Sequence, residues 1–158
     1  MSFSDFLAGN LLLDYTFRIL TGLVCGLLLG VERKVRHHTV GIKTLILITI
    51  SSTLLSILSH HMAYSGKVTG DPTRIAAGVV TGIGFLGAGT ILKTGMNIRG
   101  LTTAAIIFTS SAIGLACGNG LYEPALLILF ITIMTLTVIE KIEHKFFPVE
   151  KHFRQVPK

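Results

Sequence analysis

The chain alternates between long apolar stretches and short polar connections. Five apolar stretches, at residues 12–31, 41–59, 75–92, 101–117 and 121–139, come close to the roughly 20 residues that cross a bilayer as a helix. Helices are favoured because a lone segment in hydrocarbon must satisfy its own backbone hydrogen bonds. The pattern therefore predicts an all-α, polytopic membrane protein, a bundle of about five transmembrane helices.

The amino-acid composition also indicates that lipid, and not water, surrounds most of the chain. Half of the residues are hydrophobic and only 14% are charged, whereas soluble domains carry about 25% charged residues. Cys25 and Cys117 both lie inside apolar stretches without a CxxC partner. We therefore expect small buried thiols, with no disulfide framework and no zinc site. This composition excludes an ordinary soluble enzyme.

Basic residues lie between the apolar stretches and indicate an orientation. Eleven of the 14 Lys and Arg residues fall after the first, third and fifth stretches. By the positive-inside rule, the N-terminus is then outside and the C-terminus is cytoplasmic. The same distribution argues against a nucleic-acid partner despite the net charge of +6. Residues 1–17 contain no Lys or Arg, so we expect the first stretch to be an anchor and not a cleaved signal.

We expect two parts in the chain. Residues 1–139 form the transmembrane domain, and residues 140–158 form a short basic juxtamembrane tail on the cytoplasmic side. The tail is too short for a second domain. In the membrane part, Asn119-Gly120 is a turn signal that predicts an antiparallel hairpin of the last two helices.

Glycine spacing predicts how the helices pack, because small residues let helix backbones approach closely in lipid. The expected helix-packing glycines are Gly22, Gly26, Gly30, Gly78, Gly82, Gly84, Gly87 and Gly89. The five in the third stretch have a second interpretation, a bend or the lining of a polar passage. The second and fifth stretches are rich in Leu and Ile, which predicts that they face lipid.

Charged residues near the membrane are the candidate functional positions. Arg18 lies four residues after Asp14 in the first stretch, where it either forms a structural pair or snorkels, or else belongs to a polar site. Glu32 and Arg33 end that stretch, and Glu32 needs a cationic partner, which Arg99 supplies if the two loops meet. Interface anchoring is the simpler interpretation of this second group.

The third stretch has its own start signal. Asp71 is a capping residue, Pro72 fits the first helical position, and Arg74 stands three residues after Asp71, a spacing that allows an ion pair. With Arg18, Glu32, Arg33 and Arg99, these two charges would form polar clusters at the two membrane faces.

Catalytic and metal signatures are absent from the sequence. It contains no nucleophile–base pair, no paired catalytic carboxylates and no metal-ligand set, so we expect no enzyme activity, no cofactor and no bound metal. The histidine doublets 37–38 and 60–61 are interpreted as solvated loop residues. Ser and Thr in the second and fourth stretches are interpreted as interhelical hydrogen-bonding groups, with a hydroxyl-lined pathway as the alternative.

These residues carry a family resemblance. The sequence resembles the MgtC/SapB family of bacterial membrane proteins at GVER (30–33), GIKT (41–44), DPTRIAA (71–77), GIGFLGAG (82–89), RGLTTAA (99–105), and AIG (112–114) followed by GNG (118–120). The resemblance covers residues 18–139. It implies a multi-pass protein of the bacterial inner membrane, linked to growth in low magnesium and to survival in host cells. Modulation of ATP synthase and of membrane potential is attributed to the virulence-associated branch.

The resemblance leaves the function open between two classes. One is a non-enzymatic regulator of membrane ion homeostasis, a homo-oligomer in the bilayer that acts with or without another membrane protein. The other is an ion transporter or channel, related to magnesium, although no Asp or Glu lies in the middle of any predicted span. The tail after residue 139 is short, so we expect only the family's membrane domain, without the cytoplasmic C-terminal domain of the virulence proteins.

Overall fold

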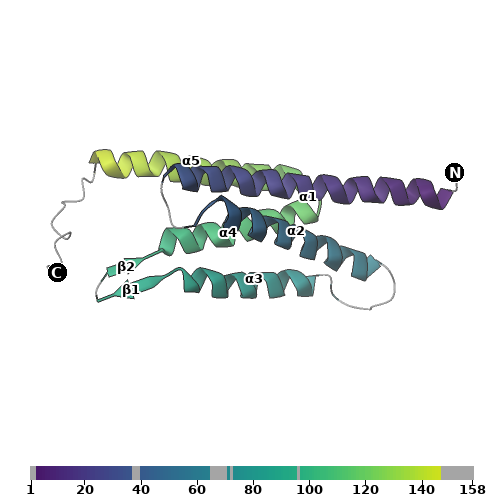
Figure 1. The fold of residues 1–158 in the computed structure, drawn as a ribbon, viewed down its shortest axis with the longest axis horizontal. Helices are drawn as coiled ribbons and strands as arrows, with labels where there is room; N and C mark the ends of the chain where they lie inside the picture. The colour runs from purple at the N-terminus through teal and green to yellow at the C-terminus, as the bar shows by residue number, and fades with distance from the viewer. Residues whose placement is uncertain (1–2, 37–39, 65–70, 72, 96, 147–158) are drawn as a thin grey trace.

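Five helices make up most of the structure. The computed structural model describes residues 3–36, 40–64, 71, 73–95 and 97–146. The helices are α1 (Phe3–Val35), α2 (Ile42–Tyr64), α3 (Thr73–Gly89), α4 (Leu101–Gly118) and α5 (Tyr122–Phe146). They run alternately up and down, roughly along one axis, so that α1 begins at one end of the bundle and α5 ends at the other (Figure 1).

Four of the helices have the length and composition of membrane spans. The qualifying segments are Asn10–Val35, Ile42–Ala63, Leu101–Gly118 and Tyr122–Ile139. Large apolar side chains cover the outside of the bundle, and Phe85, Leu127 and Phe130 are each more than half exposed. A continuous apolar exterior of this kind is unsuited to water. The predicted all-α, polytopic class is confirmed.

The third predicted span is shorter than expected. We predicted residues 75–92, but α3 has 17 residues and ends at Gly89, which gives about 25 Å at 1.5 Å per residue, against a hydrocarbon core of about 30 Å. Leu92 instead opens an antiparallel hairpin of β1 (Leu92–Thr94) and β2 (Asn97–Arg99), in which it pairs with Arg99. The expected connecting loop is therefore a small β-hairpin.

Glycines allow the hairpin to close. Gly95 and Gly100 have φ values of +63° and +91°, conformations that side chains with a Cβ rarely adopt. A Cβ on Gly100 would lie 2.0 Å from the carbonyl oxygen of Thr90. The close approach of these two backbones fixes where α4 begins relative to the end of α3.

Helix α2 is central and faces outward on only part of its surface, for example at Leu47 and Leu54, so our expectation that it faces lipid is met only in part. It packs against α1 on one side and α4 on the other, and Leu45, Thr49, Ser52 and Thr53 are almost completely buried. The expectation was incomplete because it counted only glycines as small residues. Serine and threonine provide the close-packing face of α2 and also hydrogen-bond across the interface.

Helix α5 lies at the edge of the bundle. Of its described side chains, only Ala125 and Leu129 are buried, as expected for a helix that faces lipid. The predicted turn before it is confirmed: Asn119 caps α4 and Gly120 has a φ of +75°. Helix α5 continues past Ile139 to Phe146, so the first part of the predicted tail extends this helix. Residues 147–158 lie outside the described residues.

Candidate functional site

A polar pocket lies at the end of the bundle where α2 ends and α4 turns into α5. Its volume is about 440 Å³. Side chains from α1, from the last turns of α2 and from the α4–α5 turn meet there. The lining residues are Leu11, Asp14, Tyr15, Arg18, His60, His61 and Asn119. We call this site the Arg18 pocket.

Arg18 connects α1 with the end of α4 and the turn that follows it. Its Nη2 lies 2.8 Å from Oδ2 of Asp14, the predicted pair one turn earlier on α1. Its Nη1 donates a 2.7 Å hydrogen bond to the carbonyl oxygen of Gly118, the last residue of α4. The guanidinium lies beside the backbone of Gly120, because a Cβ there would be only 3.5 Å from the Arg18 Cζ.

This arrangement explains why a charge is tolerated in a transmembrane helix. The last carbonyls of a helix lack intrahelical partners, and the C-terminal end of the helix dipole favours a cation. The two interpretations of Arg18 are therefore compatible. The guanidinium caps α4 as a structural group, and it also forms one wall of a polar pocket.

The second histidine doublet belongs to this pocket and not to a solvated loop. His60 and His61 lie in the last turns of α2, which ends at Tyr64. The Nε2 of His60 contacts Oδ1 of Asn119, and the Nδ1 of His61 lies 3.2 Å from the hydroxyl of Tyr15. These partners lie on α1 and beyond α4, far from the two histidines in sequence, so no local pattern in the sequence indicates them. The first doublet, 37–38, lies outside the described residues.

A second charged cluster lies at the opposite end of α1. Oε1 of Glu32 is 2.7 Å from Nε of Arg36 and Oε2 is 4.0 Å from Nη1 of Arg33. The Arg33 residue is only 2% exposed. The structure corrects the expected Glu32–Arg99 pairing: the partners of Glu32 come from its own helix and the turn after it, whereas Arg99 is exposed on β2.

Asp71 serves as a helix cap and not as an ion-pair partner. Its carboxylate accepts hydrogen bonds from the backbone N–H and the hydroxyl of Thr73, at 2.8 and 2.7 Å. These hydrogen bonds hold the pKa of Asp71 below its usual range. Arg74 is exposed and makes no ion pair shorter than 4 Å with any residue in the described part of the chain. The expected pairing of Asp71 with Arg74 is therefore not formed.

The interface of α2 and α4 is a seam of hydroxyl groups. Thr49 contacts Ser110 at 2.9 Å, and Ser52 contacts Ser111 at 3.2 Å. Thr53 donates to the carbonyl oxygen of Gly114 at 3.0 Å. These groups are buried and partnered, so they act as interhelical hydrogen-bonding groups. The alternative of a hydroxyl-lined pathway receives no support from the geometry of this seam.

The expected helix-packing glycines fall into two groups. Gly22, Gly26 and Gly30 form one face of α1, where an added Cβ would lie 2.5–2.6 Å from atoms of α2. In α3 only Gly87 touches a neighbour, Ala104 of α4. The remaining four have no atom within 4 Å of a Cβ position: Gly78, Gly82, Gly84 and Gly89. The α1 glycines therefore pack helices within the chain, and most of the α3 glycines do not.

The described residues contain no group of three or more His, Cys, Asp or Glu side chains arranged to hold a metal ion. Three described carboxylates near the bundle ends have structural roles: Asp14 pairs with Arg18, Glu32 pairs with Arg36, and Asp71 caps α3. These three sites are thus ion pairs and a helix cap, and the Arg18 pocket combines charged, hydroxyl and imidazole groups in one cavity.

Helical spans with an apolar exterior and polar clusters at both ends define a multi-pass membrane protein. The family model described as "MgtC family" matches residues 19–145, and the chain belongs to this family. It is 44% identical over 126 residues to "Putative magnesium transporter YhiD" of Escherichia coli (strain K12), covering 77% of this chain and 57% of that protein. It is 43% identical over 116 residues to "Protein MgtC" of Brucella abortus (strain 2308), covering 72% and 46%.

The matched region is the membrane part of the chain. The chain spans about half the length of the curated relatives it matches. No solved structure matches the chain. The family resemblance inferred from the sequence motifs is confirmed, and one of these relatives is named as a putative magnesium transporter.

Proposed function

We propose that this chain is a non-enzymatic, magnesium-related regulator of ion homeostasis in the bacterial inner membrane. The observation that carries the proposal is the closed α2–α4 seam. Its hydroxyls are already bonded to each other and to backbone carbonyls, as in Thr53 to Gly114. No acidic residue lies within the seam. The bundle interior thus resembles a packed structural core more than a conduction path.

Magnesium chemistry supports the same proposal. Mg²⁺ demands near-octahedral oxygen coordination and sheds its water reluctantly, so proteins usually bind it through one or two carboxylates with several waters retained. Among the described residues that line the Arg18 pocket, Asp14 is the only acid, and the Arg18 guanidinium is 2.8 Å away. A fixed positive charge beside the one available carboxylate disfavours a divalent cation.

Regulation requires a partner and a defined orientation. We propose that the chain acts as a homo-oligomer or together with another membrane protein, with its N-terminus outside and its basic C-terminal end in the cytoplasm. Gly84 and Gly89 of α3 are uncovered, and the β1–β2 hairpin, which includes Lys93 and Arg99, lies at the end of the bundle where α5 ends (Figure 1). The activity that we propose for the chain, acting as an oligomer or with another membrane protein, is modulation of membrane potential or of ATP synthase.

Reconstitution and growth together test the proposal. The purified protein in liposomes loaded with a magnesium-sensitive dye should give the same Mg²⁺ entry as protein-free liposomes, with or without a membrane potential. Cells that express it should still gain growth in low-magnesium medium, and cross-linking in those cells should retrieve a membrane protein. Protein-dependent Mg²⁺ entry that is lost in Arg18→Gln would overturn the regulator assignment.

An ion transporter is the second candidate function. The specific observation in its favour is the Arg18 pocket, a polar cavity at the end of a transmembrane bundle. The relative named "Putative magnesium transporter YhiD" is consistent with it. Transport would require the α2–α4 seam to open. The flux measurement therefore separates the two functions, with Arg18→Gln and Asp71→Asn as the variants that a transporter should not tolerate.

A further inference from the structure

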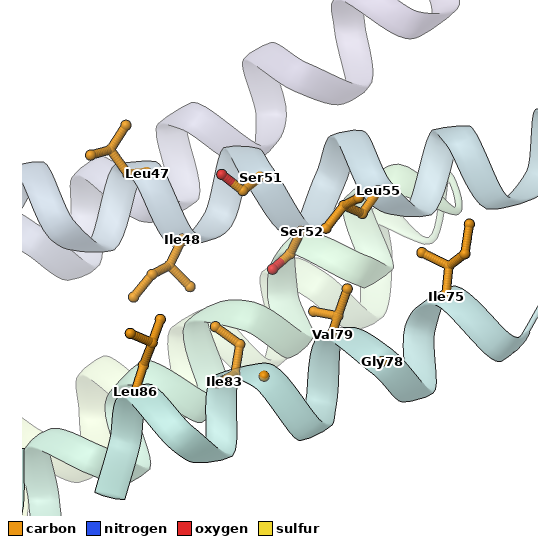
Figure 2. Close-up of a pocket in the computed structure, with 11 residues that line it drawn as sticks. Leu47, Ile48, Ser51, Ser52, Leu55, Ile75, Gly78, Val79, Ile83 and Leu86 are labelled. Atoms are coloured by element: carbon orange, nitrogen blue, oxygen red, sulfur yellow. The ribbon is translucent and has the colours of Figure 1, made fainter. Parts of the chain in front are cut away.

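A groove runs between α2 and α3, on the side of α2 away from α1. Figure 2 shows the two helices with side chains of both lining the space between them. The groove has a volume of about 680 Å³ and is open along one side. The walls are Leu47, Ile48, Ser51, Ser52 and Leu55 on α2, and Ile75, Gly78, Val79, Gly82, Ile83 and Leu86 on α3.

The chemistry of the groove selects an apolar occupant. All but two of its side chains are hydrocarbon or glycine, and one of the two serines, Ser52, is already bonded to Ser111 of α4. Gly78 and Gly82 have no side chains, so they leave space on the α3 side of the groove, and no atom lies within 4 Å of either Cβ position. Four of the five helices have the composition of membrane spans, so the medium around the groove is lipid.

The size of the groove favours a hydrocarbon chain over a helix. From Ile75 to Leu86 the groove follows α3 for about 16 Å. A helix is about 10–12 Å wide, so a segment of that length would occupy roughly 1,300 Å³, about twice the volume available. A single extended acyl chain is much narrower than a helix. The volume also falls within the roughly 300–1,000 Å³ of small-ligand sites.

Two opposite charges stand at one end of the groove. Arg74 directly precedes the lining residue Ile75 and lies one turn from Gly78. Its guanidinium makes no ion pair with any described residue, whereas guanidinium is the side chain best suited to bind phosphate. The Asp71 carboxylate, held by Thr73, is exposed three residues earlier. A headgroup with a phosphate and an ammonium matches both charges.

We propose that the α2–α3 groove is a phospholipid site. One acyl chain of a phosphatidylethanolamine lies along Gly78 and Gly82, the phosphate meets Arg74, and the ammonium meets Asp71. The site is independent of the proposed function, because a regulator and a transporter could both carry a bound lipid. It gives the uncovered Gly78 and Gly82 a role that packing within the chain does not supply.

Matched leucine substitutions on α3 test the groove. The full chain is taken up in nanodiscs of phosphatidylethanolamine and phosphatidylglycerol in equal amounts, and retained lipids are counted by native mass spectrometry. Gly82→Leu fills the groove, whereas Gly84→Leu adds the same side chain on another face of the helix, where no atom lies within 4 Å. Retained phosphatidylethanolamine should fall about tenfold in the first variant and stay unchanged in the second.

Arg74→Gln tests the end of the groove that carries the two charges. This variant should retain about tenfold less phosphatidylethanolamine, and its helix content, measured by circular dichroism, should not change. Lys43, one turn from Leu47 at the other end of the groove, provides the control: Lys43→Gln should have no effect. Three outcomes would overturn the proposal. The first is that Gly82→Leu retains as much lipid as the wild type. The second is that phosphatidylglycerol is retained preferentially and is lost in Lys43→Gln. The third is that the wild type is a lipid-free dimer that Gly82→Leu disrupts, because a second copy of the chain would then occupy the groove.

Discussion

The contact between α4 and α2 makes Gly114 a sensitive position for the stability of the bundle. A Cβ added there would lie 2.4 Å from the backbone carbonyl oxygen of Thr49 and 2.8 Å from Cβ of Ser52. Ordinary contact begins at 3.4 Å. Because one of the atoms is backbone, no rotamer change relieves the overlap. In Gly114→Ala, the two helices must separate by about 1 Å.

The magnitude follows from three contributions. Overpacking of a fitted interface costs about 1–3 kcal/mol. Separation also weakens the seam hydrogen bonds of Thr49, Ser52 and Thr53, each worth about 0.6 kcal/mol in a membrane protein. Alanine has a helix propensity about 1 kcal/mol better than glycine, which offsets part of the loss. We expect Gly114→Ala to lower the free energy of unfolding by about 2–4 kcal/mol.

Gly84→Ala is the matched control, because it makes the same chemical change in a helix where no atom lies within 4 Å of the new Cβ. It should leave the free energy of unfolding unchanged or raise it by up to about 1 kcal/mol. Both variants are measured by circular dichroism during titration of mixed micelles with sodium dodecyl sulfate. If Gly114→Ala unfolds at the wild-type detergent fraction, or if Gly84→Ala is equally destabilised, α2 and α4 do not pack as closely at Gly114 as the structure places them.

Three further perturbations address the polar groups. Arg18→Gln loses a charge-assisted hydrogen bond to Gly118 and should destabilise the folded state by about 1.5–3 kcal/mol in the same titration, whereas Arg18→Lys should recover part of the loss. Thr53→Val keeps the shape but leaves the Gly114 carbonyl without its interhelical donor. It should cost about 0.6 kcal/mol, and a stabilised variant would show that this hydrogen bond does not contribute. Asp71 has a folded-state pKa below its unfolded value, so its contribution is present above the unfolded pKa and is lost as pH falls through the folded pKa. Wild type should therefore lose thermal stability on acidification more steeply than Asp71→Asn, and parallel pH profiles would contradict the role of the Asp71 cap.

The sequence by itself determined the class of protein and its local chemistry. Spans of about 20 apolar residues predict membrane helices from length and composition alone, because hydrocarbon leaves a single segment no other way to satisfy its backbone. Interactions within one helical turn were also predictable. The Asp14–Arg18 pair has four-residue spacing, and Asp71 caps the helix that starts just after it. The glycine turn before α5 follows from backbone conformation at Gly120.

Tertiary structure decided which faces meet. Glycine spacing identified small faces on both α1 and α3, but all three α1 glycines pack against α2, whereas on α3 only Gly87 touches a neighbour. Periodicity gives the direction of a face and not what lies opposite it. For the same reason, the sequence did not show that α2 is central. Its serines and threonines form a hydrogen-bonded seam only because α4 lies opposite and supplies their partners.

The Arg18 pocket shows this limit most clearly. His60 is 42 positions from Arg18 and Asn119 is 59 positions from His60, so neither contact has a local signal in the sequence. They meet because α2 and α4 run in the same direction, opposite to α1, so that the C-terminal ends of both helices lie beside α1 (Figure 1). The residues set the helices and their caps. The packing of helix against helix set the pocket, the seam and the groove, because those features exist only where two or more surfaces meet.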